Sequence, residues 1–237
     1  MTDNTMTDDT RDDYTGEVSP GGPPDRRTAG SLEITKLAVD AQMHNNCYLL
    51  RCSETGDQVL VDAADEAHRL LELVGGRGLS AVVTTHQHWD HHRALAEVVA
   101  GTGATVIAGA PDADAITEQT GVTVDQRVRD DDRIQVGTCS LLVIPVAGHT
   151  PGSICLLYDD SAGASGRPHL FTGDSLFPGG VGNTQGDPDR FAQLIGDVSS
   201  RIFDALPDET WFYPGHGNDS TLGVERPHVE EWRERGW

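Results

Sequence analysis

The sequence is poor in basic residues: 17 Lys and Arg stand against 38 Asp and Glu in 237 residues, which gives a net charge of −21. Proteins that bind nucleic acid neutralise phosphates with Lys and Arg, and this chain has no stripe of such residues. We therefore expect no nucleic-acid partner and attribute the acidity to solubility.

Cysteine is scarce as well, and the four residues Cys47, Cys52, Cys139 and Cys155 form neither a CxxC pair nor a dense framework. This pattern predicts buried free thiols in a cytosolic protein rather than disulfides. Cys47 and Cys52 are five positions apart in one predicted strand, so they should face opposite sides of it.

Long apolar runs are missing too. No stretch approaches the roughly 18 residues of a membrane span, so no membrane partner is expected. The acidic N-terminus has neither the basic region nor the apolar region of a signal peptide. Together these absences predict a cytoplasmic protein.

Residues 1–30 lack apolar residues almost entirely and contain one aromatic residue, Tyr14. Such a segment buries too little apolar surface to offset its ordering entropy, so it is predicted to be a disordered acidic tail. The domain is then expected over residues 31–237, and removal of the tail is expected to leave stability and turnover unchanged.

The remaining residues show alternating or apolar runs and helical periodicity. Strands are predicted at 32–39, 47–52, 59–61, 81–85, 104–108, 133–136, 140–146, 153–158, 170–172 and 211–213. Helices are predicted at 65–74, 91–100, 111–119, 189–206 and 225–235. Successive strands followed by helices in each half predict an α/β (α+β) fold, a four-layer αβ/βα sandwich.

The densest group of candidate functional side chains lies between a predicted strand and a predicted helix. Residues 84–92 read TTHQHWDHH and contain His86, His88, Asp90 and His91. Alternate residues of an extended segment point the same way, so these side chains can converge. Imidazole and carboxylate groups suit zinc, iron or manganese. The alternative is a polar loop that happens to be rich in histidine, which explains this density poorly.

Three later residues repeat one pattern: a His or Asp in a glycine-flanked loop after a predicted strand. They are His149 in GHTPGS, Asp174 in GDSLF and His216 in PGHG. Glycine lets the backbone turn sharply or approach a site closely, and strand ends hold ligands rigidly. With the first cluster they make seven ligand-type groups, enough for two metal ions.

The order HxHxDH, GHTPGS, GDSLF and PGHG resembles the metallo-β-lactamase-fold hydrolases over about residues 31–223. The resemblance implies that His86, His88 and His149 hold a first metal ion. It implies a second ion on Asp90, His91 and His216, with Asp174 bridging the two. It also implies that Asp62 orients a ligand histidine; an ordinary turn residue is the alternative for Asp62.

Within the family the chain is most similar to the type II glyoxalases (hydroxyacylglutathione hydrolases) and their compact relatives. It departs from them at His92-Arg93, where glycines are usual, and at Gly182-Asn183-Thr184, where the compact relatives commonly carry GRT. Only about ten residues follow Glu225, so we expect no helical C-terminal domain of the kind that binds glutathione in full-length type II glyoxalases. The resemblance therefore supports the hydrolase chemistry and leaves the carrier thiol open.

Two divalent ions, zinc in the first place and iron or manganese as alternatives, can share a water and lower its pKa toward about 7. We therefore expect attack of a metal-bound hydroxide on an acyl thioester, a small-molecule substrate. A thiolate, with a conjugate-acid pKa near 8.5, departs without a general acid. Asp90 is the candidate catalytic residue, as a ligand and as a proton acceptor near the hydroxide.

Other functions remain as alternatives. A mono-iron persulfide dioxygenase would use His86, His149 and Asp174 alone and leave the second set without metal. A zinc β-lactamase of the common kind carries cysteine in place of Asp174, and a non-catalytic metal-binding protein would not need the complete set.

Five histidines remain outside the set. His92 is predicted not to be a ligand, and His44 is a candidate for the pocket mouth. His68, His169 and His228 are predicted to be surface residues. The sequence does not indicate an oligomeric state.

Overall fold

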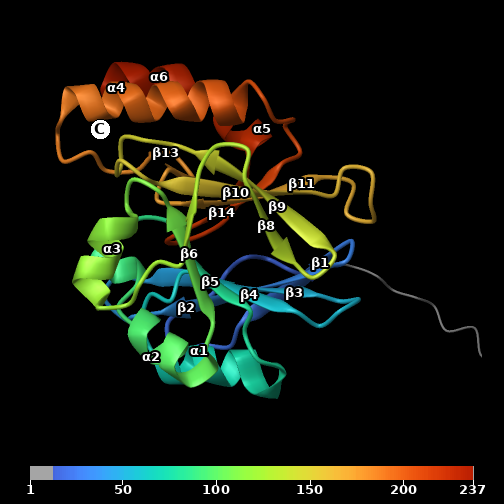
Figure 1. Cartoon of the computed structure of the whole chain (residues 1–237). Coiled ribbons are helices and arrows are strands. Elements are labelled where there is room, and N and C mark those ends of the chain that lie inside the picture. Colours follow the sequence, from blue (N-terminus) through green and yellow to red (C-terminus); the bar gives the residue numbers. More distant parts are fainter. Residues whose placement is uncertain (1–12, 237) are drawn as a thin grey trace, which may run out of the picture.

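The computed structural model describes residues 13–236, and the first part of the predicted tail, residues 1–12, lies outside this range. Within it the chain forms a sandwich of four layers, as predicted. Figure 1 shows α1 and α2 under one sheet and α4 and α6 over the other, with the two sheets facing each other between them.

The first sheet has the strand order β1-β2-β3-β4-β5-β6-β7. Its strands are antiparallel from β1 to β4 and parallel from β4 to β7. They are β1 Asp25–Ala29, β2 Leu32–Val39, β3 Asn45–Cys52, β4 Gln58–Val61, β5 Ala81–Thr84, β6 Thr105–Gly109 and β7 Gln126–Val128.

The second sheet has the order β15-β14-β11-β10-β9-β8 and is antiparallel except where β11 lies parallel to β14. Its strands are β8 Arg133–Val136, β9 Cys139–Pro145, β10 Ile154–Asp159, β11 Pro168–Gly173, β14 Trp211–Pro214 and β15 Ser220–Thr221. A separate small hairpin joins β12 Leu176–Phe177 to β13 Gly180–Val181. The strands that the sequence did not predict are β1 and the short β7, β12, β13 and β15.

The helices cover the outer faces of the sheets. They are α1 Ala67–Val74, α2 Leu95–Thr102, α3 Ala113–Thr120, α4 Pro188–Asp197, α5 Leu222–Glu225 and α6 Val229–Arg235. Short turns of other helix types are η1 Gly75–Arg77, η2 Trp89–His91, η3 Val198–Phe203 and η4 Arg226–His228. The helix predicted to start at His91 starts later, because residues 89–91 form the tight turn η2. The helix predicted over 189–206 divides into α4 and the π-helical η3. Within the described residues, no helix is long and apolar enough to span a membrane.

Three groups of buried apolar side chains hold the layers together. One lies between the sheets, and the other two lie between each sheet and its helices. Cys52 belongs to the inter-sheet core and Cys47 to the helix side of the first sheet, as their spacing predicts. Cys139 and Cys155 are also buried, and all four cysteines are free thiols.

The prediction of disorder over residues 1–30 is wrong for residues 13–30. β1 pairs along its whole length with β2, from Asp25 opposite Lys36 to Ala29 opposite Leu32. Tyr14 is 7% exposed and packs edge-on against Trp211 and Tyr213 in the inter-sheet core. One aromatic anchor and one strand order this segment despite its polar composition.

His169 is a second correction, because it is completely buried rather than on the surface. It lies in β11, where its Nδ1 is 2.8 Å from the Tyr213 hydroxyl and its Nε2 is 3.0 Å from Ser165 Oγ. Burial is the main cause that lowers the pKa of His169 to about 4. His68 and His228 are exposed, as predicted.

The depressed pKa of His169 makes the fold sensitive to acid. A histidine that stays neutral when folded stabilises the protein fully above its unfolded pKa of about 6.5, and this stability is lost as the pH falls toward 4. Between pH 7.5 and pH 5 we expect metal-free protein to lose about 2 kcal/mol of unfolding free energy through His169 alone. Urea unfolding of the parent and of His169→Gln at both pH values measures this difference, with His68→Gln as the exposed control. Equal pH dependence in the parent and His169→Gln would contradict this role.

Candidate metal centre

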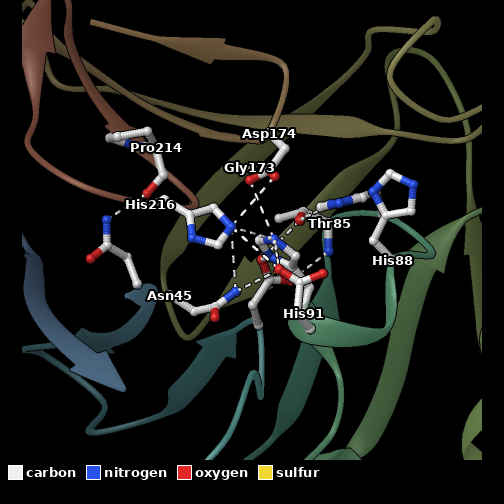
Figure 2. Close-up of polar contacts among 12 residues, drawn as sticks. Asn45, Thr85, His88, His91, Gly173, Asp174, Pro214 and His216 are labelled. Carbon is white, nitrogen blue, oxygen red and sulfur yellow. Dashed lines mark hydrogen bonds and ion pairs between the residues drawn. The ribbon is translucent and has the colours of Figure 1, made fainter. Parts of the chain in front are cut away.

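The predicted ligands come from four segments that meet at one end of the sandwich. Residues 85–92 leave β5, and η2 turns Asp90 and His91 back toward the strand ends. The loops after β9, β11 and β14 carry His149, Asp174 and His216. Figure 2 shows Asp174, His216 and His91 pointing toward one another, with Asn45 of β3 beside them.

The structure brings all seven predicted residues into three overlapping groups. In each group the nitrogen or oxygen atoms lie within 4.8 Å of one another. The groups are His86, His88 and His149; His86, His91 and Asp174; and Asp90, His91 and His216. The first and last groups are the two sets that the resemblance implied.

Asp174 lies between these two sets. Its Oδ1 is 3.3 Å from His91 Nε2, and its Oδ2 is 3.5 Å from His216 Nε2 and 3.7 Å from His149 Nε2. Oδ1 is also buried without a hydrogen-bond partner, as is His86 Nε2. Buried polar atoms are nearly always satisfied, so these two are oriented for a group that protein atoms do not supply.

The histidine rings are held by their outer nitrogens. The Nδ1 atoms of His91, His149 and His216 each lie 2.8 Å from an acceptor, respectively Asp62 Oδ2, the Asn183 carbonyl and the Met43 carbonyl. A neutral ring that donates from Nδ1 presents a lone pair at Nε2. Hydrogen bonds of this kind orient metal ligands in other proteins.

The inner nitrogens then face each other at short range. His91 Nε2 is 3.2 Å from His216 Nε2, and His88 Nδ1 is 2.9 Å from His149 Nε2. Two nitrogens on one tetrahedral zinc ion lie roughly 3.3 Å apart, given bonds of about 2.0–2.1 Å. Facing lone pairs need a cation or a proton between them, so the geometry of the donors fits a metal centre.

The pKa values divide the histidines into two kinds. Burial holds the pKa of His86 well below its usual value, lowers that of His149 to about 4 and also lowers that of His88. These three rings are therefore neutral and available as ligands at pH 7. For His91 and His216 burial acts in the same direction, but nearby carboxylates outweigh it and raise the pKa, for His216 to about 9.

The carboxylates are correspondingly ionised. Burial opposes ionisation of Asp90, yet the hydrogen bond with His216 and the charge of His91 hold its pKa well below the usual range. The pKa of Asp174 is lowered in the same way, with His91 as the largest opposing cause after burial. Protons on His91 and His216 thus balance the carboxylates where metal ions would otherwise do so.

Asp62 holds the first loop in place. Its carboxylate accepts hydrogen bonds from the Thr85 amide at 2.7 Å and the Thr85 hydroxyl at 2.8 Å, besides its contact with His91. Asp62 adopts a left-handed backbone conformation with φ of 58° at the end of β4. It is therefore placed to orient His91, and the alternative of an ordinary turn residue explains less.

Sequence reasoning missed Asp112, which connects two of the ligand loops. Its buried carboxylate accepts hydrogen bonds from the Gln87 amide at 2.9 Å, the Thr150 hydroxyl at 2.6 Å and the Gly152 amide at 2.7 Å. Burial raises the pKa of Asp112. No local pattern in the sequence distinguishes it from a residue at the start of a helix.

Three further residues support the ligands. Arg190 of α4 donates to the backbone carbonyls of Gly148 and His149, and Asn45 donates to Asp90 Oδ2 at 3.0 Å. Gly215 is required because a Cβ there would lie 2.2 Å from Asp174 Oδ1.

The remaining two histidines lie beside the centre. His92 is buried but outside the three groups, with Nε2 3.1 Å from the Gln87 carbonyl, which agrees with its prediction as a non-ligand. His44 is exposed and lies in the loop before Asn45.

The αβ/βα sandwich thus carries, at one end, three overlapping groups of His and Asp residues that could hold metal ions. The family model described as the metallo-beta-lactamase superfamily matches residues 41–216. The chain belongs to this superfamily, and the predicted fold is confirmed.

Known relatives agree with this placement. A "Hydroxyacylglutathione hydrolase" of Polaromonas sp. is 36% identical over 187 residues, which cover 77% of this chain and 66% of the relative. One of Fuscovulum blasticum is 35% identical over 187 residues, covering 78% and 67%. The chain thus spans about two thirds of the length of these curated relatives.

Two solved structures are similar in fold and sequence. ETHE1 from Myxococcus xanthus is 28% identical with a TM-score of 0.69, and the match covers 83% of this chain and 82% of that one. TTHA1623 in a di-iron-bound form is also 28% identical, with a TM-score of 0.61 and coverage of 81% and 96%.

Proposed function

We propose that this protein is a binuclear metal-dependent hydrolase that cleaves an acyl thioester. The observation that carries the proposal is the pair of three-residue groups on either side of Asp174. A single-metal enzyme has no need for the second group of Asp90, His91 and His216.

The ligand roles follow from the groups. His86, His88 and His149 would hold one ion, and Asp90, His91 and His216 the other, with Asp174 touching both. Nitrogen and oxygen donors without cysteine suit zinc, with iron or manganese as alternatives. Such ions, when bound, acidify a water and polarise a carbonyl, which is the chemistry that hydrolysis at neutral pH needs.

Asp90 is the proposed catalytic residue. Its Oδ2 is fixed by Asn45 Nδ2 at 3.0 Å and lies 3.4 Å from His216 Nε2, so the carboxylate has one orientation at the centre. An ionised carboxylate in this place binds a cation and accepts a proton from a nearby water. Asn45 keeps that orientation without adding a charge.

A thioester suits the site because the titratable groups at its centre are committed as ligands. A thiolate, with a conjugate-acid pKa near 8.5, departs without a proton from the protein, whereas an amine or alkoxide needs one. The names of the curated relatives support an acyl-thiol substrate. The four free thiols support a reducing compartment such as the cytoplasm.

Replacement of Asp90 by Asn tests the catalytic role. The change preserves size but removes a charged ligand oxygen and a proton acceptor, so kcat should fall more than KM changes. Turnover of a panel of acyl thioesters by zinc-loaded protein measures both constants. The control is Glu97→Gln, the same chemical change on an exposed residue of α2, which should leave them unaltered. Near-normal kcat in Asp90→Asn on a thioester that the parent hydrolyses would show that Asp90 has no such role.

A second candidate is a mono-iron dioxygenase of persulfides, favoured by the likeness to ETHE1. It would use His86, His149 and Asp174 and leave the other set without metal. Oxygen uptake with a persulfide, together with one equivalent of iron, distinguishes it from thioester hydrolysis.

A further inference from the structure

Lys36 and Asp219 form a fully buried ion pair beside the loop that carries His216. The distance from Lys36 Nζ to Asp219 Oδ1 is 2.6 Å, and both side chains are 0% exposed. Lysine and aspartate are almost never buried so completely unless they are paired. The proposed function does not use either residue directly.

Every donor of the Lys36 ammonium group is satisfied. Besides Asp219, it donates to the Gly16 carbonyl and to the Gly217 carbonyl, each at 2.8 Å. Gly217 immediately follows His216, so one of the three bonds acts on the backbone next to a proposed metal ligand. The bond to the Gly16 carbonyl connects Lys36 to the segment before β1.

The second oxygen of Asp219 joins that segment to the second sheet. Oδ2 accepts hydrogen bonds from the Tyr14 hydroxyl at 2.6 Å and from Trp211 Nε1 at 3.1 Å. Tyr14 is therefore bound to a residue 205 positions away along the chain. The segment before β1 closes the ion pair against solvent.

The loop over residues 214–217 is held through its backbone, mainly by β2 and β3. Asn46 Nδ2 donates to the Pro214 and Gly217 carbonyls, each at 2.9 Å, and the Tyr48 hydroxyl donates to Pro214 at 2.6 Å. The Asn46 amide donates to the Gly215 carbonyl at 2.7 Å. Figure 2 shows Pro214 and His216 on this loop, opposite Asn45 of β3. Lys36 adds a charged donor to this loop through its bond to the Gly217 carbonyl.

A buried ion pair is not an efficient way to stabilise a core, since well-packed apolar residues often do as well or better. The buried pair of Lys36 and Asp219 is therefore better explained by a role in orienting the loop that it contacts than by a role in stability. We propose that Lys36 and Asp219 are positioning residues that, closed by Tyr14, fix the loop of His216 and so complete the second metal site. This inference rests on the proposed binuclear function.

The test removes the charges without leaving one unpaired, in the double variant Lys36→Met/Asp219→Asn. Asparagine keeps an acceptor for Tyr14 and Trp211, so we expect a folded protein. Zinc titration of the metal-free protein against a chromophoric chelator gives two dissociation constants. We expect the second ion to bind about tenfold more weakly or worse and the first to change little. Raised zinc should then restore thioesterase activity.

A matched control removes a different ion pair that also involves β2, Glu33 of β2 with Arg51 of β3, at the opposite end of these strands from His216. Glu33→Gln/Arg51→Met should leave both dissociation constants unchanged. A purely structural role for Lys36 would lower the melting temperature and leave the constants unchanged, and this result would overturn the proposal.

Tyr14→Phe decides the matter if the double variant does not fold, because it removes one donor to Asp219 and keeps the ion pair. Tyr14→Phe should raise the dissociation constant of the second ion by a few-fold, and an unchanged constant would overturn the proposal. A parent protein that binds only one ion would contradict the binuclear function, and the positioning role with it. Two ions bound equally by parent and variants would contradict the positioning role alone.

Discussion

Asp174→Ala is expected to weaken both metal ions at once and to lower thioesterase turnover by several orders of magnitude. The carboxylate reaches His91 and His216 in one set and His149 in the other, at 3.3–3.7 Å. Its loss removes an oxygen from both sites and leaves the histidine clusters without the charge that balances a cation. Elemental analysis and turnover of the purified variant measure both effects.

His216→Ala is the informative comparison for Asp174→Ala. His216 belongs to one set only, so the His216→Ala protein should retain about one metal equivalent while losing most of its activity. If Asp174→Ala also retained one full equivalent, Asp174 would not bridge the two ions.

Deletion of residues 1–30 is expected to destabilise the protein strongly. It removes β1, exposes the inter-sheet core where Tyr14 packs, and leaves Lys36 without one of its acceptors. Loss of a buried aromatic side chain alone costs about 3–5 kcal/mol. For a protein of this size that corresponds to a fall in melting temperature of roughly 10 °C or more, measured by thermal unfolding with circular dichroism.

The point variant Tyr14→Ala separates the anchor from the strand. It should reproduce a large part of the loss, because the hydroxyl and the ring both have partners in the core. An unchanged melting temperature on deletion would mean that the segment does not dock in solution.

The main strands and the residues of the candidate metal centre were predictable because their signals are local. β2 has the predicted bounds, since Leu32, Ile34, Leu37 and Val39 recur along a segment that turns bound on both sides. His86, His88, Asp90 and His91 lie within one short segment, and each of the other three candidate ligands follows a strand and a glycine. Ligand chemistry needs particular residue types at particular strand ends, and both are visible in a sequence.

What could not be predicted depends on partners distant in sequence. Tyr14 looks isolated among polar residues, and only its bond to Asp219 shows why the segment is ordered. Asp112 reads as the start of a helix until the Thr150 and Gly152 loop folds against it. His169 resembles a surface residue because its partners, Tyr213 and Ser165, come from outside its strand.

The metal content of the parent protein tests the central claim most directly. Protein purified without chelators, then equilibrated with zinc and freed of excess ion, should contain two equivalents per chain by elemental analysis. That result is expected if the two groups on either side of Asp174 each hold one ion. One equivalent, with no capacity for a second at any accessible zinc concentration, would contradict the binuclear account.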